Sequence, residues 1–228
     1  MDRKETIVIS LGGSLIVPNE IDSDFVLEFV SLIKDYVNKG FKFIIITGGG
    51  KICRKYNESL KKITNPSKDN LDWMGIATTR LNSEFVRIAF GDLAYEKVVL
   101  DPDIIPITDK PVILSAGWKP GNSSDLATVY ASHSVGAKIA INMSNTDYVY
   151  DKDPITNPDA KKFETISWDE YLKLVPESWN PGLSSPFDPI ASRYAQEQNI
   201  QVVFVNGKNL ENFKKYLNGE KFEGTIIG

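Results

Sequence analysis

Short apolar runs alternate along this chain with longer stretches in which apolar residues recur every three or four positions. The first run, at residues 6–11, is rich in β-branched residues and predicts a buried strand. The stretch at 24–38 has the period of an amphipathic helix, which the oxygens of Asp22 and Asp24 can cap and Gly40 can end. One face of this predicted helix carries four apolar side chains that we expect in the core: Phe25, Phe29, Ile33 and Tyr36.

The same alternation continues to the end of the chain. Apolar runs predict further strands at residues 41–47, 112–115, 138–143 and 201–205, a hairpin with an exposed loop at 148–159, and an edge strand at 225–227. Helices are predicted after the triple glycine at 48–50, over 72–90, 123–135 and 209–217, at the capping box 167–170, and from 186–189 to about 198. In the helix at 72–90 we expect four side chains in the core: Ile76, Leu81, Phe85 and Ile88.

Strands that alternate with helices predict an α/β fold with a mainly parallel sheet flanked by helices, a three-layer αβα sandwich. A near-continuous apolar run such as 41–47 is typical of a parallel strand that is covered on both faces. No internal repeat and no linker interrupts the pattern, so we expect a single domain over residues 1–228.

Composition narrows the choice of environment. The 228 residues are 42% hydrophobic and 25% charged, with a net charge of −4, which does not favour a nucleic-acid or membrane surface. Cys53 is the only cysteine, so no internal disulfide forms and reducing cytoplasm is the expected location. The apolar run that ends at Leu11 is too short for a signal peptide or a membrane span.

The glycines fall where chemistry is expected. Gly12-Gly13, Gly48-Gly49-Gly50 and Gly117…Gly121 each follow a predicted strand, at the edge of the sheet where ligands of α/β proteins bind. Glycine lets the backbone approach a phosphate closely, and the helix that follows directs its N–H groups at the anion. One such turn is most often only a tight turn, but three of them favour a phosphate-binding edge.

Known nucleotide motifs are missing, and several polar residues near the turns have a plain structural alternative. The chain has neither G-x-x-x-x-G-K-[ST] nor G-x-G-x-x-G. Lys51 and Arg54 follow the triple glycine on the first turns of a helix, where they can meet an anion. Asp72, at the start of a predicted helix, is either a helix cap or a ligand, and the same choice holds for residues 123–125.

At this point the residues resemble the archaeal-type UMP (uridylate) kinases of the amino acid kinase superfamily. Seven segments match in the family's order and span nearly the whole chain: Gly12-Gly13-Ser14-Leu15; Gly48-Gly49-Gly50-Lys51 with Arg54-Lys55-Tyr56; Gly75-Ile76 with Thr79-Arg80-Leu81-Asn82; Pro120-Gly121-Asn122-Ser123-Ser124-Asp125; Asn145-Thr146-Asp147 with Val149-Tyr150 and Asp153-Pro154; Ser185-Pro186-Phe187-Asp188-Pro189-Ile190-Ala191; and Gly224-Thr225. The resemblance implies transfer of a phosphoryl group from ATP to UMP, in pyrimidine nucleotide synthesis.

The resemblance also implies roles for individual residues. Residues implied at the ATP site are Gly13, Ser14, Gly50, Arg54, Ser144, Asn145, Tyr150 and Asp153. Residues implied at the UMP site are Gly49, Asp72, Trp118, Lys119, Pro120, Gly121, Asn122, Ser123 and Ser124. Lys51 and Arg54 would stabilise the moving phosphoryl group. Magnesium would arrive with ATP rather than at a metal site of the protein, and a homo-oligomer is implied because hexamers are common in the family.

Three positions depart from the family pattern. Ser10 stands where many members of the superfamily have lysine, and we expect Lys51 to replace that charge. Tyr148 replaces a glycine beside the adenine pocket, and Asn122-Ser123-Ser124 replaces His-Thr-Thr in the acceptor loop. Two alternatives therefore stay open: the same fold acting on another small phosphate, carboxylate or carbamate, and a nucleotide- or oxyanion-binding protein without catalysis.

Overall fold

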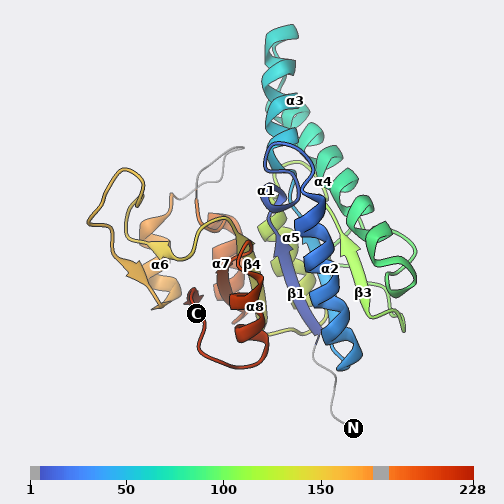
Figure 1. Cartoon of the computed structure of the whole chain (residues 1–228). Helices are drawn as coiled ribbons and strands as arrows, with labels where there is room; N and C mark the ends of the chain where they lie inside the picture. The colour runs from blue at the N-terminus through green and yellow to red at the C-terminus, as the bar shows by residue number, and fades with distance from the viewer. Residues whose placement is uncertain (1–5, 177–184) are drawn as a thin grey trace.

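The computed structural model describes residues 6–176 and 185–228, and its centre is a seven-stranded sheet (Figure 1). The strand order is β3-β2-β1-β4-β8-β9-β7. The strands are β1 (Thr6–Leu11), β2 (Lys42–Thr47), β3 (Val112–Ser115), β4 (Ile139–Ser144), β7 (Thr165–Ile166), β8 (Gln201–Asn206) and β9 (Thr225–Ile227). A separate two-stranded hairpin pairs β5 (Val149–Tyr150) with β6 (Lys162–Phe163).

The strands from β3 to β8 are parallel, as the continuous apolar runs predict. Strand β9 runs antiparallel to β8 and parallel to β7. The prediction that residues 225–227 form an edge strand is therefore wrong. The edge is β7, a strand of two residues without a long apolar pattern, which is why it gave no signal in the sequence.

Helices cover both faces of the sheet, so the predicted three-layer αβα arrangement is confirmed (Figure 1). Helix α2 (Ser23–Asn38), α8 (Leu210–Leu217) and the last turns of α4 (Lys68–Phe90) pack on one face. Helix α5 (Ser124–Ser134) and α7 (Pro189–Glu197) pack on the other. The remaining helices are α1 (Gly13–Ile16), α3 (Gly50–Ile63), the 3₁₀ turn η1 (Gly91–Leu93) and α6 (Trp168–Leu174).

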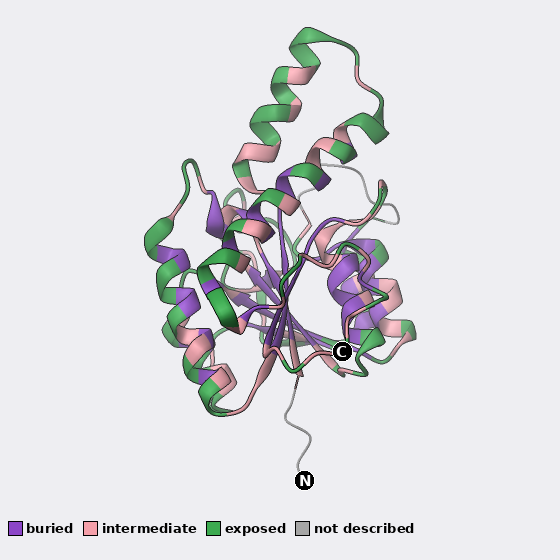
Figure 2. Cartoon of the chain, turned by 90° about the vertical axis from the view of Figure 1, so that its right-hand side faces the viewer, coloured by how far each residue is buried: buried purple, intermediate pink, exposed green. Residues whose placement is uncertain are grey.

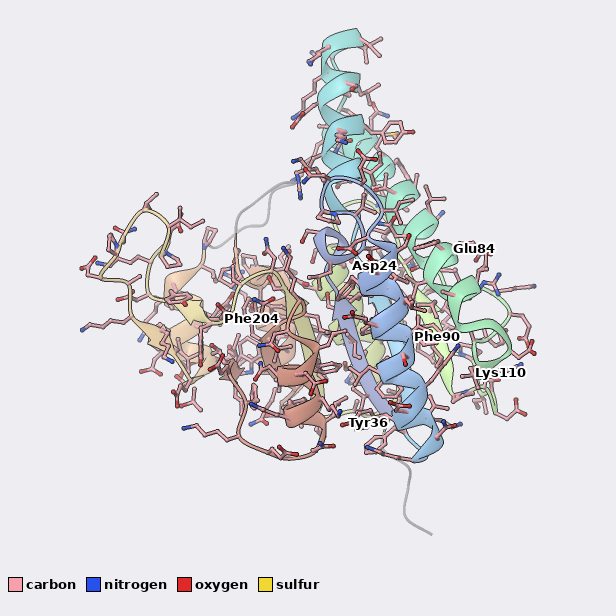
Figure 3. The ribbon with its side chains drawn as sticks, viewed as in Figure 1. Asp24, Tyr36, Glu84, Phe90, Lys110 and Phe204 are labelled. Atoms are coloured by element: carbon pink, nitrogen blue, oxygen red, sulfur yellow. The ribbon has the colours of Figure 1, made fainter. Side chains whose placement is uncertain are left out.

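Alternate residues of each strand enter opposite layers, which links the strand pattern to the two cores. In β1, Ile9 and Leu11 join the core under α2, and Val8 joins the core under α5. The four side chains predicted for the inner face of α2 are all buried. At the far end of that helix, Tyr36 (Figure 3) donates a hydrogen bond of 2.6 Å to Asn218 Oδ1 and so ties α2 to the end of α8.

Helix α4 contradicts the core prediction in part. Ile76 is buried, but Leu81, Phe85 and Ile88 are 64%, 36% and 64% exposed. The side of α4 that faces the sheet is polar instead, and its buried residues include Thr79, Asn82 and Ser83. The usual rule that apolar residues point inward fails here, because the inner face of α4 binds backbone groups of the strand ends.

Helices α3 and α4 project together beyond the carboxyl ends of the strands (Figures 1 and 2). In the described structure none of the residues of α3 is buried, and its surface in Figure 2 is almost wholly exposed or intermediate. The two helices run side by side, and the cleft between them opens at the glycine turns of the sheet edge. Within residues 6–176 and 185–228, no helix is long and apolar enough to cross a membrane.

Candidate active site

The first two glycine turns lie in direct backbone contact at the end of the sheet. A Cβ atom on Gly13 would lie 2.1 Å from the backbone nitrogen of Gly50, and one on Gly48 would lie 2.5 Å from the nitrogen of Gly13. Gly50 has a φ of +68°, which side chains other than glycine rarely tolerate. The prediction that these glycines serve close backbone approach is therefore supported by the geometry, because no side chain fits between the two turns.

The third glycine turn is held by α4. The backbone N–H of Gly117 donates to Thr79 Oγ1 at 2.9 Å, and Arg80 donates to the carbonyl oxygens of Gly117 and Trp118 at 3.3 and 3.2 Å. On the same helix face, Asn82 Nδ2 donates to the carbonyl of Gly48 at 2.8 Å. The polar inner face of α4 thus fixes the second and third turns relative to each other.

A cavity of about 660 Å³ lies between α3 and α4 and opens on these turns. Its lining follows a helical stripe on each wall. The α3 side contributes Gly50, Cys53, Arg54, Asn57, Glu58 and Lys61. The α4 side contributes Leu71, Asp72, Gly75, Ile76 and Thr79, and the remaining contributors are Gly49, Gly117, Asn122, Ser123, Ser124, Asn145 and Ser185. The volume is of the size that holds a small organic ligand, whose typical range is about 300–1,000 Å³.

Eight of the residues predicted for the nucleotide sites line this cavity together: Gly49, Gly50, Arg54, Asp72, Asn122, Ser123, Ser124 and Asn145. They come from α3, α4, the third glycine turn and the loop after β4. Gly13 meets the cavity edge through its contact with Gly50. The structure therefore brings the donor-side and acceptor-side predictions to one place at the sheet edge.

Other predicted residues lie outside the cavity lining. Lys51 donates a short hydrogen bond to Asn19 Oδ1, so its ammonium points toward the loop before α2. Asp153 caps its own turn by accepting from the N–H of Ile155 at 2.9 Å. Tyr150 lies edge-to-face with Tyr148 at 6.4 Å on the β5 hairpin. The predicted residues Ser14, Ser144, Trp118, Lys119, Pro120 and Gly121 are also absent from the lining of this cavity.

Asp72 is not a helix cap. Helix α4 begins at Lys68, four residues earlier than predicted, and Ser67 and Asn70 form a capping box at its start. Asp72 lies in the second turn, is 9% exposed, and accepts a hydrogen bond of 2.8 Å from the N–H of Gly121. The capping alternative for Asp72 is therefore wrong, whereas Ser123 does cap α5 by accepting from the N–H of Leu126 at 3.1 Å.

A carboxyl group that no prediction singled out connects four elements behind the turns. Asp125 Oδ1 accepts from Ser10 Oγ at 3.1 Å on β1 and from Asn142 Nδ2 at 3.4 Å on β4. Its Oδ2 accepts from the N–H of Asp188 at 3.1 Å, just before α7. Burial raises the pKa of Asp125 to about 7, and the nearby Asp188 carboxyl raises it as well.

Comparison with known proteins decides the family. The sequence pattern of the amino acid kinase family matches residues 5–206. This chain belongs to the amino acid kinase family.

Its relatives within that family point in one direction. The chain is similar to the uridylate kinase of Methanocaldococcus jannaschii, with 31% identity over 96% of the chain and 99% of the relative. Similarity to the uridylate kinase of Thermococcus onnurineus is 30% over 97% and 98%. The solved structure of uridylate kinase from Archaeoglobus fulgidus superposes with a TM-score of 0.82 at 28% identity, over 98% of this chain and all of the other.

Sequence reasoning missed several residues that line the cavity of this amino acid kinase: Cys53, Asn57, Glu58, Lys61, Leu71 and Thr79. A signal was present for those on α3, because positions 50, 53–54, 57–58 and 61 recur with the helical period. Arg54 belongs to that stripe, so the remainder of the stripe could have been placed on the same wall. The contacts of Asp125 had no comparable signal, since Ser10 lies 115 residues away along the chain.

Asp125 makes the stability of the fold depend on pH. The folded protein holds a proton on Asp125 that the unfolded chain loses near its ordinary pKa of 3.8. Stability therefore falls as pH rises from about 4 to about 7, by at most about 1.4 kcal/mol per pH unit from this group, and the full penalty is present above pH 7. Asp125→Asn removes the ionisation, so at pH 8 the variant is expected to be more stable than wild type by about 1–3 kcal/mol.

The measurement is urea unfolding of both proteins at pH 5 and at pH 8. The free-energy gain of Asp125→Asn should be large at pH 8 and small at pH 5. An equal difference at both pH values would mean that the Asp125 carboxyl does not titrate in this interval.

Proposed function

We propose that this protein transfers the γ-phosphoryl group of ATP to UMP and releases UDP and ADP. The observation that supports the proposal most strongly is the meeting of three glycine turns at one end of a nucleotide-sized cavity. The uridylate kinases among its relatives agree in sequence over nearly the full chain, and one agrees in structure. In this proposal the whole chain acts as one domain.

The phosphate end of the cavity suits two anions in close proximity. Gly49 and Gly50 present backbone N–H groups at the start of α3, a helix of 14 residues whose positive end points at the turn. Arg54, one helical turn further, lines the same cavity and can form a forked contact with a phosphoryl group. Gly13 reaches the same point from the first turn, so both phosphate chains can approach along backbone rather than past side chains.

On the acceptor side, Asp72 is the residue best placed to hold the ribose of UMP. Its carboxylate is nearly buried at the cavity wall, where a hydrogen bond to a hydroxyl is stronger than in water. The bond from Gly121 to Asp72 also draws the acceptor loop toward α4. We assign Trp118, Lys119, Pro120, Gly121, Asn122, Ser123 and Ser124 to the wall around the acceptor.

On the donor side, we assign Gly13, Ser14, Ser144, Asn145, Tyr150 and Asp153 to ATP. The described residues hold no group of three or more His, Cys, Asp or Glu side chains that could bind a metal by themselves. Magnesium therefore enters this proposal on the oxygens of the triphosphate, where it neutralises part of the charge. Cytoplasm, where both nucleotides are made and used, is the proposed location.

The chemistry requires positioning and charge stabilisation but no strong base. A phosphate oxygen of UMP is already anionic near neutral pH and attacks the γ-phosphorus directly, while the ADP oxygen leaves. Backbone N–H groups and the Arg54 guanidinium stabilise the charge that spreads over the transferred oxygens. A catalytic role for Lys51 requires its ammonium to leave Asn19 and turn toward the phosphates.

The proposal predicts that ADP release depends on UMP. In a coupled assay with ATP and magnesium, UMP should stimulate ADP release far more than AMP, GMP or acetylglutamate does, and removal of magnesium by a chelator should abolish it. A protein that only binds nucleotides would raise its melting temperature with ATP yet release no ADP. Absence of turnover with every nucleoside monophosphate would refute the proposed function.

Arg54 is exposed at the phosphate end, so its loss should affect catalysis and spare folding. Arg54→Ala is expected to lower kcat by about 10²–10³, the effect of removing an electrostatic stabiliser of a transition state. Arg54→Lys should recover only part of the rate, because lysine lacks the fork. Thermal melting serves as the control, and a variant with normal kcat would reduce Arg54 to a solvated surface charge.

We also propose that the protein forms a homo-oligomer, with the hexamer as the size that the family resemblance implies. Leu81, Phe85 and Ile88 make an exposed apolar stripe on α4, and a second copy of this chain is the partner that we assign to it. Leu81→Glu combined with Ile88→Glu should reduce the mass measured by light scattering after gel filtration. Leu27→Glu, at an equally exposed leucine of α2, is the matched control and should leave the mass unchanged.

A further inference from the structure

The cavity wall contains a buried acceptor that no described residue satisfies. Asn57 lies on α3 about two helical turns beyond Gly50 and lines the cavity. Its Oδ1 atom is buried and accepts no hydrogen bond from residues 6–176 or 185–228. Buried polar groups in folded proteins nearly always have a partner, so an orphan at the wall of a ligand cavity points to a donor on the ligand.

The orientation of the Asn57 carboxamide follows from its neighbours. Its Nδ2 lies 3.4 Å from the carbonyl oxygen of Leu71 and 3.9 Å from Cys53 Sγ, and it donates to both. Turning the amide over would set Oδ1 against the Leu71 carbonyl, which brings two acceptors together. The N–H groups of Asn57 are therefore committed to the protein, and only the acceptor is left for a ligand.

The position of Asn57 along the cleft can be read from the pairs that α3 and α4 form. Gly49 lies opposite Thr78, Cys53 lies opposite Gly75, and Asn57 lies opposite Leu71. The phosphate end is thus at Gly49, and Asn57 is beside the residue that precedes Asp72. The two side chains that can accept a hydrogen bond from a sugar, Asp72 and Asn57, stand on facing walls of one cavity.

We propose that Asn57 is a specificity-determining residue that accepts a hydrogen bond from a ribose hydroxyl of the acceptor nucleotide. The proposal rests on the proposed function, in which Asp72 binds the same ribose. A vicinal diol offers two O–H donors, and Asp72 and Asn57 offer an acceptor each. The uracil edge, in contrast, presents a donor beside an acceptor and would need an amide N–H that Asn57 has already committed. Asn57 thus selects ribonucleotides over deoxyribonucleotides.

The test compares UMP with its 2′-deoxy and 3′-deoxy analogues in wild type and in Asn57→Leu. Loss of one neutral hydrogen bond should lower kcat/KM for UMP roughly 2- to 10-fold. The analogue that lacks the contacted hydroxyl should keep its wild-type kcat/KM, so the preference for UMP over that analogue collapses. Asn57→Asp retains an acceptor and should retain the preference, and Ser59→Leu on the exposed side of α3 should behave as wild type.

A second measurement separates recognition from folding. Without nucleotide, Asn57→Leu should melt at or above the wild-type temperature, since it removes an unsatisfied acceptor. The rise in melting temperature that saturating UMP causes should be smaller in Asn57→Leu than in wild type.

Two results would overturn the proposal and leave the proposed function intact. One is an equal loss in Asn57→Leu for UMP and both deoxy analogues, or no preference for UMP over them in wild type. The other is a changed ratio of UMP to CMP with an unchanged preference for the ribose, which would place Asn57 at the base. A wild-type protein without turnover of any nucleoside monophosphate would instead remove the proposed function itself.

Discussion

The backbone contact between the first and second glycine turns is the constraint on which the site depends. Gly13, Gly48 and Gly50 approach so closely that a single Cβ atom would force two strand ends apart. Because β1 and β2 are hydrogen-bonded neighbours, this contact also fixes where α3 begins and where its N–H groups point. The fold thus supplies a phosphate-sized opening made of backbone, and side chains act on it only from the rim.

Helix α4 converts that local contact into a complete site. Its inner face holds the second turn through Asn82 and the third through Thr79, so one rigid element sets the spacing between them. The cost is an apolar outer face, which an isolated chain would leave in water. In this protein, assembly with other copies and construction of the active site are consequences of the same helix.

Much of the fold could be predicted from the sequence, because buried strands and the face of α2 obey simple periodicities. The predictions failed where a polar group had a distant partner. Asp72 resembled a cap because its ligand-facing role and its bond to Gly121, 49 residues away, leave no trace in local sequence. Leu81 resembled a core residue because local pattern cannot distinguish a helix face that meets the sheet from one that meets another chain. The Asp125 contacts lay beyond local pattern for the same reason.

The exposed arm formed by α3 has a thermodynamic consequence. A helix without a buried residue has little free energy that holds it to the body, so it can open without unfolding the sheet. Any acceptor that touches both walls of the cleft must then add its binding energy to the stability of α3. Order in the arm and occupancy of the cleft become two measures of one equilibrium, and backbone amide exchange along α3 would report on bound acceptor without any catalytic turnover.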